Sequence, residues 1–294
     1  MNQALLSQCL STERPQRTLA KEASFAGIGL HTGKCVRMRF CPQPEGSGIF
    51  FRRTDLPGQP VIPASIEYVQ ATERRSVIGI GEAQVHTIEH VLAAIRAHDI
   101  DNLCIELSDA EPPVANGSAE AFVKMIEEAG VVEQDASIRI VDLKSPVAWS
   151  NDTIFLVALP YPGFKISYTL HYPQSSAIRS QYCSLEIDAD SFRKEIAPCR
   201  TFSLYEEVSM LIDHGLIRGG SLDNSVVIKD DTIFSKESLR FPDEMARHKI
   251  LDLVGDLSLV GFSFRAHIIA VRSGHTSNVA FAKKIYQHIT EASL

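Results

Sequence analysis

The sequence predicts an α+β fold made of two similarly built domains, each with helices layered on a mostly antiparallel sheet. Three observations support this prediction. The chain has 294 residues, which is long for one hydrophobic core and suits two domains of about 150 residues each. In each half, alternating segments precede a stretch of helical period, which then leads into a buried strand. A polar run, Glu133-Gln134-Asp135, separates the halves.

The first half begins with alternating apolar and polar residues around Gly27, Gly29 and Gly33, a pattern typical of strands joined by tight turns. Farther along, apolar residues recur at helical spacing, and Gly130 follows a second helical pattern that it can end. The expected strands lie within 17–45, at 49–51 and at 100–107, and the expected helices lie at 85–97 and 119–129.

The second half repeats this succession of strands and helices. Its strongest helical pattern runs from 245 to 259, and Asp230-Asp231 can form the turn of a hairpin. The expected strands are 138–149, 153–159, 164–170, 225–229, 232–234 and 266–272. The expected helices are 186–196, 203–214, 245–259 and a last helix that follows Ser273-Gly274-His275 and runs to the C-terminus.

Composition and charge exclude several classes of protein. The formal net charge of −7 argues against nucleic-acid binding, which usually needs a basic face. No apolar run approaches the ~20 residues of a transmembrane helix. Residues 1–17 lack the basic start and the long apolar segment of a signal peptide. The six cysteines include no C-x-x-C pair, so we expect reduced thiols and a cytoplasmic protein.

A histidine and two aspartates share one face of the strongest helical pattern. His248, Asp252 and Asp256 are spaced by four residues, so their side chains point the same way. Most such His-x3-Asp pairs belong to a solvated helix face. Here Glu89 and His90 offer complementary groups on another helix, and a third ligand from that helix would complete a metal site with a position open for water.

A rival interpretation uses only the first half of the chain. His86-x-x-Glu89-His90 matches the inverted zinc motif H-x-x-E-H, in which both histidines bind the metal and the glutamate activates water. It predicts a peptidase with His86 as a ligand and gives no role to His248 or Asp252. The residues alone leave both interpretations open.

Six motifs follow one another along the chain. They are Gly27-Ile28-Gly29-Leu30-His31-Thr32-Gly33-Lys34, Phe51-Arg52-Arg53-Thr54-Asp55, Thr87-Ile88-Glu89-His90, Arg200-Thr201-Phe202, Arg247-His248-Lys249-Ile250-Leu251-Asp252-Leu253-Val254-Gly255-Asp256 and Ser273-Gly274-His275. In this order they resemble the UDP-3-O-acyl-N-acetylglucosamine deacetylases of lipid A biosynthesis, over about residues 16–285. The resemblance implies an N-terminal extension (1–15) and an active site at the interface of two domains. With the boundary placed at the polar run, these are an N-terminal domain (16–132) and a C-terminal domain (137–294).

The resemblance also implies the metal ligands. Carried over by motif, His90, His248 and Asp252 would bind Zn²⁺, a set of two imidazoles and one carboxylate that leaves a water site open. Glu89, next to the first ligand, would be the general base that activates water. His86 has no role in the family.

Five further residues have roles implied by the resemblance. His275, oriented by Asp256, would act as an acid or as an electrostatic partner, because a neighbouring carboxylate raises the pKa of a histidine. Thr201 would donate a hydrogen bond to the oxyanion that forms at the acetamide carbonyl. Lys249 would contact the sugar or its phosphate, and Phe202 would pack near the glucosamine ring.

The resemblance also implies an apolar passage for the acyl chain of the substrate, formed by an insert in the second domain. The matching residues are Val208, Ile217, Gly220 and Val227, since apolar side chains beside a glycine can leave a channel. From the residues alone, ordinary core packing around a turn explains this stretch equally well.

The function expected from these observations is zinc-dependent hydrolysis of the N-acetyl group of UDP-3-O-acyl-N-acetylglucosamine, with release of acetate. We expect a monomer whose partner is this small-molecule substrate. Two alternatives remain at this point: the peptidase of the inverted motif, and a sugar-nucleotide-binding protein that has lost turnover. The presence of Glu89 argues against the second, because a binding protein does not need a base beside its metal.

Overall fold

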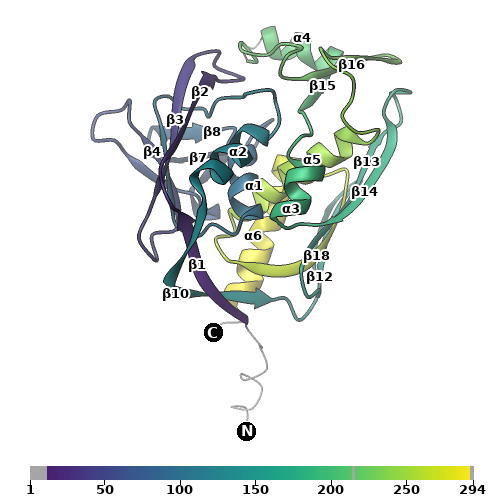
Figure 1. Ribbon diagram of the computed structural model, residues 1–294. Helices are drawn as coiled ribbons and strands as arrows, with labels where there is room; N and C mark the ends of the chain where they lie inside the picture. The colour runs from purple at the N-terminus through teal and green to yellow at the C-terminus, as the bar shows by residue number, and fades with distance from the viewer. Residues whose placement is uncertain (1–11, 214–215, 292–294) are drawn as a thin grey trace.

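The structure, a computed structural model, describes residues 12–213 and 216–291. It has a mixed α+β architecture with four sheets, and most strand pairs are antiparallel. Most helices lie between a five-stranded sheet and a seven-stranded sheet (Figure 1). This arrangement confirms the predicted fold class.

The five-stranded sheet comes from the first half of the chain. Its order is β2 (Ala23–Ile28), β3 (Cys35–Pro42), β9 (Leu103–Leu107), β4 (Ile49–Arg53) and β5 (Val61–Pro63), with β4 and β9 parallel. A smaller sheet has the order β6 (Val69–Ala71), β7 (Val77–Ile80) and β8 (Ala83–His86). The helices of this half are α1 (Glu89–Ala97), α2 (Glu120–Ala129) and a 3₁₀ turn (Ile66–Tyr68).

The seven-stranded sheet combines the first described strand with strands of the second half of the chain. Its main path is β1 (Thr12–Leu19), β10 (Val131–Asp142), β18 (Phe264–Val271), β12 (Ile154–Leu159) and β11 (Val147–Asn151), and β13 (Phe164–Tyr172) with β14 (Arg179–Glu186) branches from β18. Apart from the insert described below, the helices of the second half of the chain are α3 (Ala189–Ser191), a π-helical turn (Phe192–Ile196), α5 (Glu244–Ser258) and α6 (His275–Glu291).

An insert lies at the top of the view in Figure 1, above α5 and β13. It consists of α4 (Tyr205–Asp213) and a three-stranded sheet of β15 (Phe202–Leu204), β16 (Val226–Lys229) and β17 (Thr232–Phe234). The predicted hairpin is confirmed, because β16 and β17 pair as antiparallel neighbours on either side of Asp230-Asp231.

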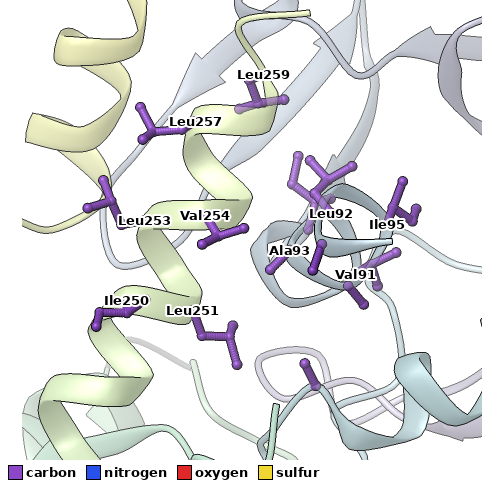
Figure 2. Packing of buried hydrophobic residues seen from close by; sticks show 14 of the residues in the cluster. Val91, Leu92, Ala93, Ile95, Ile250, Leu251, Leu253, Val254, Leu257 and Leu259 are labelled. Carbon is purple, nitrogen blue, oxygen red and sulfur yellow. The ribbon is translucent and has the colours of Figure 1, made fainter. Parts of the chain in front are cut away.

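The centre of the core is the contact between α1 and α5. Figure 2 shows Leu251 and Val254 of α5 on the side that faces α1, with Ala93 of α1 opposite. All three side chains are completely buried. Burial of each leucine or valine side chain contributes about 1.5–3 kcal/mol to folding. This contact therefore holds the two helices that carry the candidate metal ligands in a fixed relation.

Two predicted elements were wrong at their ends. The helix expected from residue 85 begins at Glu89, because Val85 and His86 belong to β8, where His86 pairs with Val77. The strand expected at 138–149 is two strands, β10 and β11, separated at Pro146, which lacks the N–H that a central strand needs.

The polar run at the expected domain boundary is part of a strand. Residues 131–142 form β10, and Glu133 pairs with Arg17 of β1, so this run is held in the sheet and is not a free linker. Part of the expected extension also lies in this sheet, since Thr12 pairs with Ile140. Residues 1–11 lie outside the described residues.

Strands β5, β6, β7 and β14 were not predicted, and the strand expected at 100–107 begins at Leu103. Other differences concern helix lengths. The helix expected at 186–196 begins at Ala189, because β14 continues to Glu186. The helix expected at 203–214 begins at Tyr205, because the preceding residues form β15, and its last residue lies outside the described part of the chain. The last helix is described to Glu291.

Candidate active site

A cavity of about 480 Å³ opens between the two halves of the chain. It is lined by the first turn of α1, by α5 and by segments that include Thr201, Ile217 and His275. A cavity of this size, with apolar walls and a few converging polar groups, is typical of a site for a small organic ligand.

Two histidines and one aspartate converge at the floor of this cavity. His90, His248 and Asp252 each offer one ligand atom, and these atoms lie within 4.8 Å of one another. The Nε2 atoms of His90 and His248 lie 3.6 Å and 3.4 Å from the same oxygen of Asp252, Oδ1. Two imidazoles and a carboxylate in this arrangement can hold a metal ion and leave a position for water.

Neighbouring groups prepare two of these residues to bind a metal. Nδ1 of His248 lies 3.0 Å from the carbonyl oxygen of Cys199, so Nδ1 carries the proton and Nε2 presents its lone pair. Burial lowers the pKa of His248 to about 4, which keeps the imidazole neutral. Burial opposes the charge of Asp252, but Lys249 and His248 outweigh it and hold the pKa of this carboxyl well below its usual range. Nζ of Lys249 donates to Oδ2 of Asp252 at 2.9 Å.

Glu89 is the first residue of α1 and precedes His90. Burial raises the pKa of its carboxyl, which makes the carboxylate a better proton acceptor. The backbone N–H of Ser76, 3.3 Å from Oε2, and the positive end of the helix stabilise its charge.

On α5, a Cβ at position 255 would overlap the backbone of Glu89, so the two helices approach this closely only because Gly255 has no side chain.

His275, at the start of α6, faces Glu89 across the site, with Nε2 3.9 Å from Oε1. Its Nδ1 lies 2.9 Å from Oδ2 of Asp256. Burial would lower the pKa of His275, but Asp256 and Glu89 outweigh it and raise this pKa to about 10, so the ring is protonated at neutral pH. Asp256 is itself fixed by the hydroxyl of Ser76 at 2.5 Å and the amide of Asn278 at 2.8 Å.

Two more of the expected residues lie where the chain enters β15: Thr201 directly precedes this strand and Phe202 is its first residue. Thr201 and Phe202 both line the cavity, and Nζ of Lys249 lies 5.6 Å from the centre of the Phe202 ring. The residue before them anchors this segment to α5, because Arg200 Nε donates to Oε1 of Glu244 at 2.8 Å in a buried ion pair. The ion pair between Arg200 and Glu244 therefore fixes the segment of Thr201 against α5.

The residues expected to form the acyl passage are only partly brought to the cavity. Ile217 lines it, whereas Val208, Gly220 and Val227 do not. Gly220 lies behind the wall, where a Cβ would be 3.8 Å from Cδ1 of Leu30, a lining residue.

His86 is not part of the candidate metal site formed by His90, His248 and Asp252. Its Nδ1 is 3.2 Å from Oγ1 of Thr87 and 3.9 Å from Oε1 of Glu111, and its ring packs edge-on against His31. Burial lowers the pKa of both His31 and His86 to about 4, so these rings are neutral. The structure therefore separates His86 from His90, although the two are only four residues apart in the sequence.

Sequence reasoning missed the residues that support the site. Ser76 and Asn278 bind Asp256, and the carbonyl of Cys199 orients His248. Asn278 has a weak signal, since it lies one helical turn after Ser273-Gly274-His275. Ser76 and the backbone of Cys199 have none, because a serine in a loop and a carbonyl group are present in every protein.

Comparison with known proteins decides between the interpretations. Residues 16–287 match the family described as UDP-3-O-acyl N-acetylglycosamine deacetylase. The chain belongs to this family. A relative from Chlamydia pneumoniae, named UDP-3-O-acyl-N-acetylglucosamine deacetylase, is 50% identical over 276 residues, covering 94% of this chain and 98% of the relative. A relative of the same name from Chlamydia felis is 49% identical over 277 residues, covering 94% and 99%.

Membership of this deacetylase family confirms the resemblance and shows that the peptidase interpretation was wrong. It is a family of enzymes, so the alternative of a binding protein without turnover also loses its basis. Within the described residues, no helix is long and apolar enough to cross a membrane.

Proposed function

We propose that this chain is a zinc-dependent hydrolase that removes the N-acetyl group of UDP-3-O-acyl-N-acetylglucosamine and releases acetate, in lipid A biosynthesis. Family membership and the names of the relatives support the reaction. The structural observation that carries the proposal is the convergence of His90, His248 and Asp252 in a cavity that Glu89 also lines.

The metal-binding residues fit zinc by the chemistry of their atoms. Two neutral imidazole nitrogens and one carboxylate are a usual ligand set for catalytic zinc, and the proton on Nδ1 of His248 leaves Nε2 free to bind. We assign His90, His248 and Asp252 as the ligands. Bound there, zinc supplies Lewis acidity, which lowers the pKa of a water and polarises a carbonyl group.

We assign proton transfer to two side chains, Glu89 and His275. Glu89 takes the proton of the attacking water, because burial raises the pKa of its carboxyl and makes the carboxylate more basic. His275, which Asp256 and Glu89 keep protonated, then donates a proton to the leaving amine. Asp256 orients the ring of His275 through Nδ1 and leaves Nε2 to act.

The remaining polar residues bind the substrate. The hydroxyl of Thr201 donates a hydrogen bond to the oxygen on which negative charge develops. Lys249, protonated and bound to Asp252, contacts the sugar or its phosphate, and Phe202 packs against the glucosamine ring. The pKa of Lys249 supports this role, because Asp252 more than offsets the effect of burial and raises that pKa above its ordinary value.

We assign the acyl chain to the side of the cavity below the insert. Ile217 is in contact with the cavity there. Gly220, Val208 and Val227 are assigned to the outer part of the passage, behind this wall.

We propose that the enzyme acts as a monomer in the cytoplasm, with domains at 16–132 and 137–294. A monomer is supported because one chain supplies all three ligands and both proton-transfer residues. A reducing compartment is supported by the free cysteines of the described chain, at positions 35, 41, 104, 183 and 199.

The test is acetate release from UDP-3-O-acyl-N-acetylglucosamine by the purified protein. We expect turnover that a chelator abolishes and that added Zn²⁺ restores. Turnover that is unaffected by the chelator would contradict the zinc-dependent mechanism, and no acetate release at any metal concentration would contradict the reaction itself.

A further inference from the structure

One buried carboxylate near the site has no role in the proposed reaction. Glu111 lies in the loop between β9 and α2 and is 1% exposed. It is not among the residues that line the cavity in the described chain. Within the described residues, Glu111 is within ion-pair distance of His86, with Nδ1 and Oε1 3.9 Å apart. Burial lowers the pKa of His86 to about 4, so this ring carries no charge at neutral pH and cannot balance the carboxylate. Hydrogen bonds must therefore stabilise the charge of Glu111.

Those hydrogen bonds come from two different turns. In the turn between β2 and β3, the backbone N–H of His31 lies 3.0 Å from Oε1, and the backbone N–H and hydroxyl of Thr32 each lie 3.0 Å from Oε2. Gly29 in this turn makes the approach possible, because a Cβ there would overlap the carboxylate. From the turn before α1, the hydroxyl of Thr87 donates to Oε1 at 2.9 Å.

The turn before α1 is strained. Thr87 has a φ of 55°, in the left-handed region that a β-branched residue rarely adopts. Hydrogen bonds hold it there: its N–H donates to the carbonyl of Ser76 at 3.1 Å, and its hydroxyl donates to Glu111 and lies 3.2 Å from Nδ1 of His86. Thr87 is followed after one residue by Glu89 and His90, so its conformation sets where the catalytic base and the first ligand begin.

The turn between β2 and β3 forms a wall of the cavity. Leu30 and His31 both line it, and the carbonyl of Leu30 accepts the N–H of Gly219 at 3.0 Å from the insert. The same turn therefore connects Glu111 to the loop that carries Ile217.

We propose that Glu111 is a positioning residue for the deacetylation, which couples the first turn of α1 to the substrate-binding wall. The inference rests on the proposed function. Glu111 is not among the proposed metal ligands or the residues that line the cavity in the described chain. It acts by holding Thr87 in its strained conformation and by fixing the turn that carries Leu30 and His31. Replacement of its charge should thus change turnover and substrate affinity together, without loss of the metal.

The first experiment compares Glu111→Gln with Glu106→Gln. A glutamine offers one acceptor oxygen and a donating amide, so the donors of the two turns can no longer all be satisfied. Glu106 is a matched control on the neighbouring strand, where it pairs with Arg39 and Arg52 on the outer side of the sheet. We expect Glu111→Gln to lower kcat by roughly 10- to 100-fold and to raise KM, at unchanged metal content per folded protein. Equal kinetics in the two variants would overturn the proposal.

A second pair of variants guards against misfolding of Glu111→Gln. Thr87→Ser keeps the hydroxyl, whereas Thr87→Val removes it at nearly the same volume. We expect the valine variant to have a kcat about tenfold lower than the serine variant, and its effect to be non-additive with that of Glu111→Gln in a double-mutant cycle. Equal kcat values for the two Thr87 variants, or additive effects in the cycle, would show that Glu111 does not act through Thr87.

Hydrogen exchange gives a readout that does not depend on the reaction. In Glu111→Gln, the amides of His31 and Thr32 should exchange faster than in the wild type, and the segment 86–90 should follow, whereas Glu106→Gln should leave both unchanged. If the wild type released no acetate, the proposed function would fail while this measurement still tested Glu111. Unchanged exchange in both segments would overturn the positioning role.

Discussion

The two helices that carry the candidate metal ligands hold them in different ways. On α5, His248, Asp252 and Asp256 are interior residues spaced by four, so the regular geometry of the helix aligns them. On α1, Glu89 and His90 are the first two residues, and a turn with a strained Thr87 determines where they lie. The α5 residues depend on local helical geometry, whereas the α1 residues depend on contacts made by distant segments.

This difference shows how the work of the site is divided. Two of the three proposed ligands lie on α5, together with Asp256, which contacts the ring of His275. The third proposed ligand and the proposed base lie at the start of α1, and a helix N-terminus favours a carboxylate at the first position. Substitutions in α5 should therefore remove the metal, whereas substitutions at the start of α1 should separate metal binding from turnover.

The largest effect is expected from the loss of a proposed ligand on α5. In His248→Ala the site loses one of three ligands, so we expect bound zinc to fall to background and acetate release to fall more than about 100-fold. Metal analysis of the purified protein and the acetate assay measure the two losses. Retention of stoichiometric zinc would show that His248 is not a ligand.

Removal of the base should separate the two functions of α1. In Glu89→Ala we expect zinc content to be unchanged, because His90 remains, while turnover falls by about 10²- to 10⁴-fold. The measurement is kcat per bound zinc. A rate near that of the wild type would remove Glu89 from the mechanism.

The stabilisation that the buried ion pair between Arg200 and Glu244 gives the folded protein should depend on pH. Burial would raise the pKa of Glu244, but the hydrogen bond from Arg200 more than offsets it and lowers this pKa. The stabilisation is therefore complete above the unfolded-state pKa of about 4.3 and is lost as the pH falls through the folded-state value.

Glu244→Ala leaves the buried guanidinium of Arg200 unpaired and should lower the free energy of unfolding by about 3 kcal/mol at neutral pH. Denaturant unfolding at neutral and acidic pH measures this, and the difference from the wild type should shrink in acid. Glu22→Ala, which breaks an exposed pair with Arg39, is the control and should cost less than about 1 kcal/mol. A cost for Glu244→Ala as small as the control would contradict the anchoring role.

A methyl group at the crossing of the two helices tests their contact directly. In the middle of a helix, a change from glycine to alanine normally stabilises by about 1 kcal/mol. Gly255→Ala should instead destabilise the protein by about 1–3 kcal/mol, because the new methyl group overlaps the backbone of Glu89. We expect turnover to fall with it, and a rise in the unfolding midpoint would show that α1 and α5 do not need this approach.

The smallest expected effect concerns His86. His86→Ala should keep its zinc and most of its turnover, and the loss of the contact with Thr87 should cost about 0.5–1.5 kcal/mol of stability. Zinc analysis and thermal unfolding check the two expectations. Loss of zinc in this variant would restore His86 as a ligand and overturn the set assigned from α5.

Regular spacing explains which features the sequence could predict. The face of α5 and the hairpin of β16 and β17 follow from periodicity and from a two-residue turn, both of which are local. Position 85 illustrates the opposite case: Val85 fits the apolar spacing of the following helix, yet β7 pairs with it as a strand. Pairing across a sheet overrides local periodicity here, because the strand conformation of Val85 is set by its partner Ile78 and not by the residues that follow it.

The sequence by itself determined the α+β class, the shared face of His248, Asp252 and Asp256, and the motifs that identify the family. These depend on the order of residues and on the constant geometry of helices and strands. Only the tertiary structure decided that His90 lies with these residues while His86 points away to Glu111. His86 ends a strand and His90 lies in a helix, so the turn at Thr87 sends their side chains to different sites. That turn is held by contacts with segments far away in the chain, and such contacts form only when the whole chain has folded.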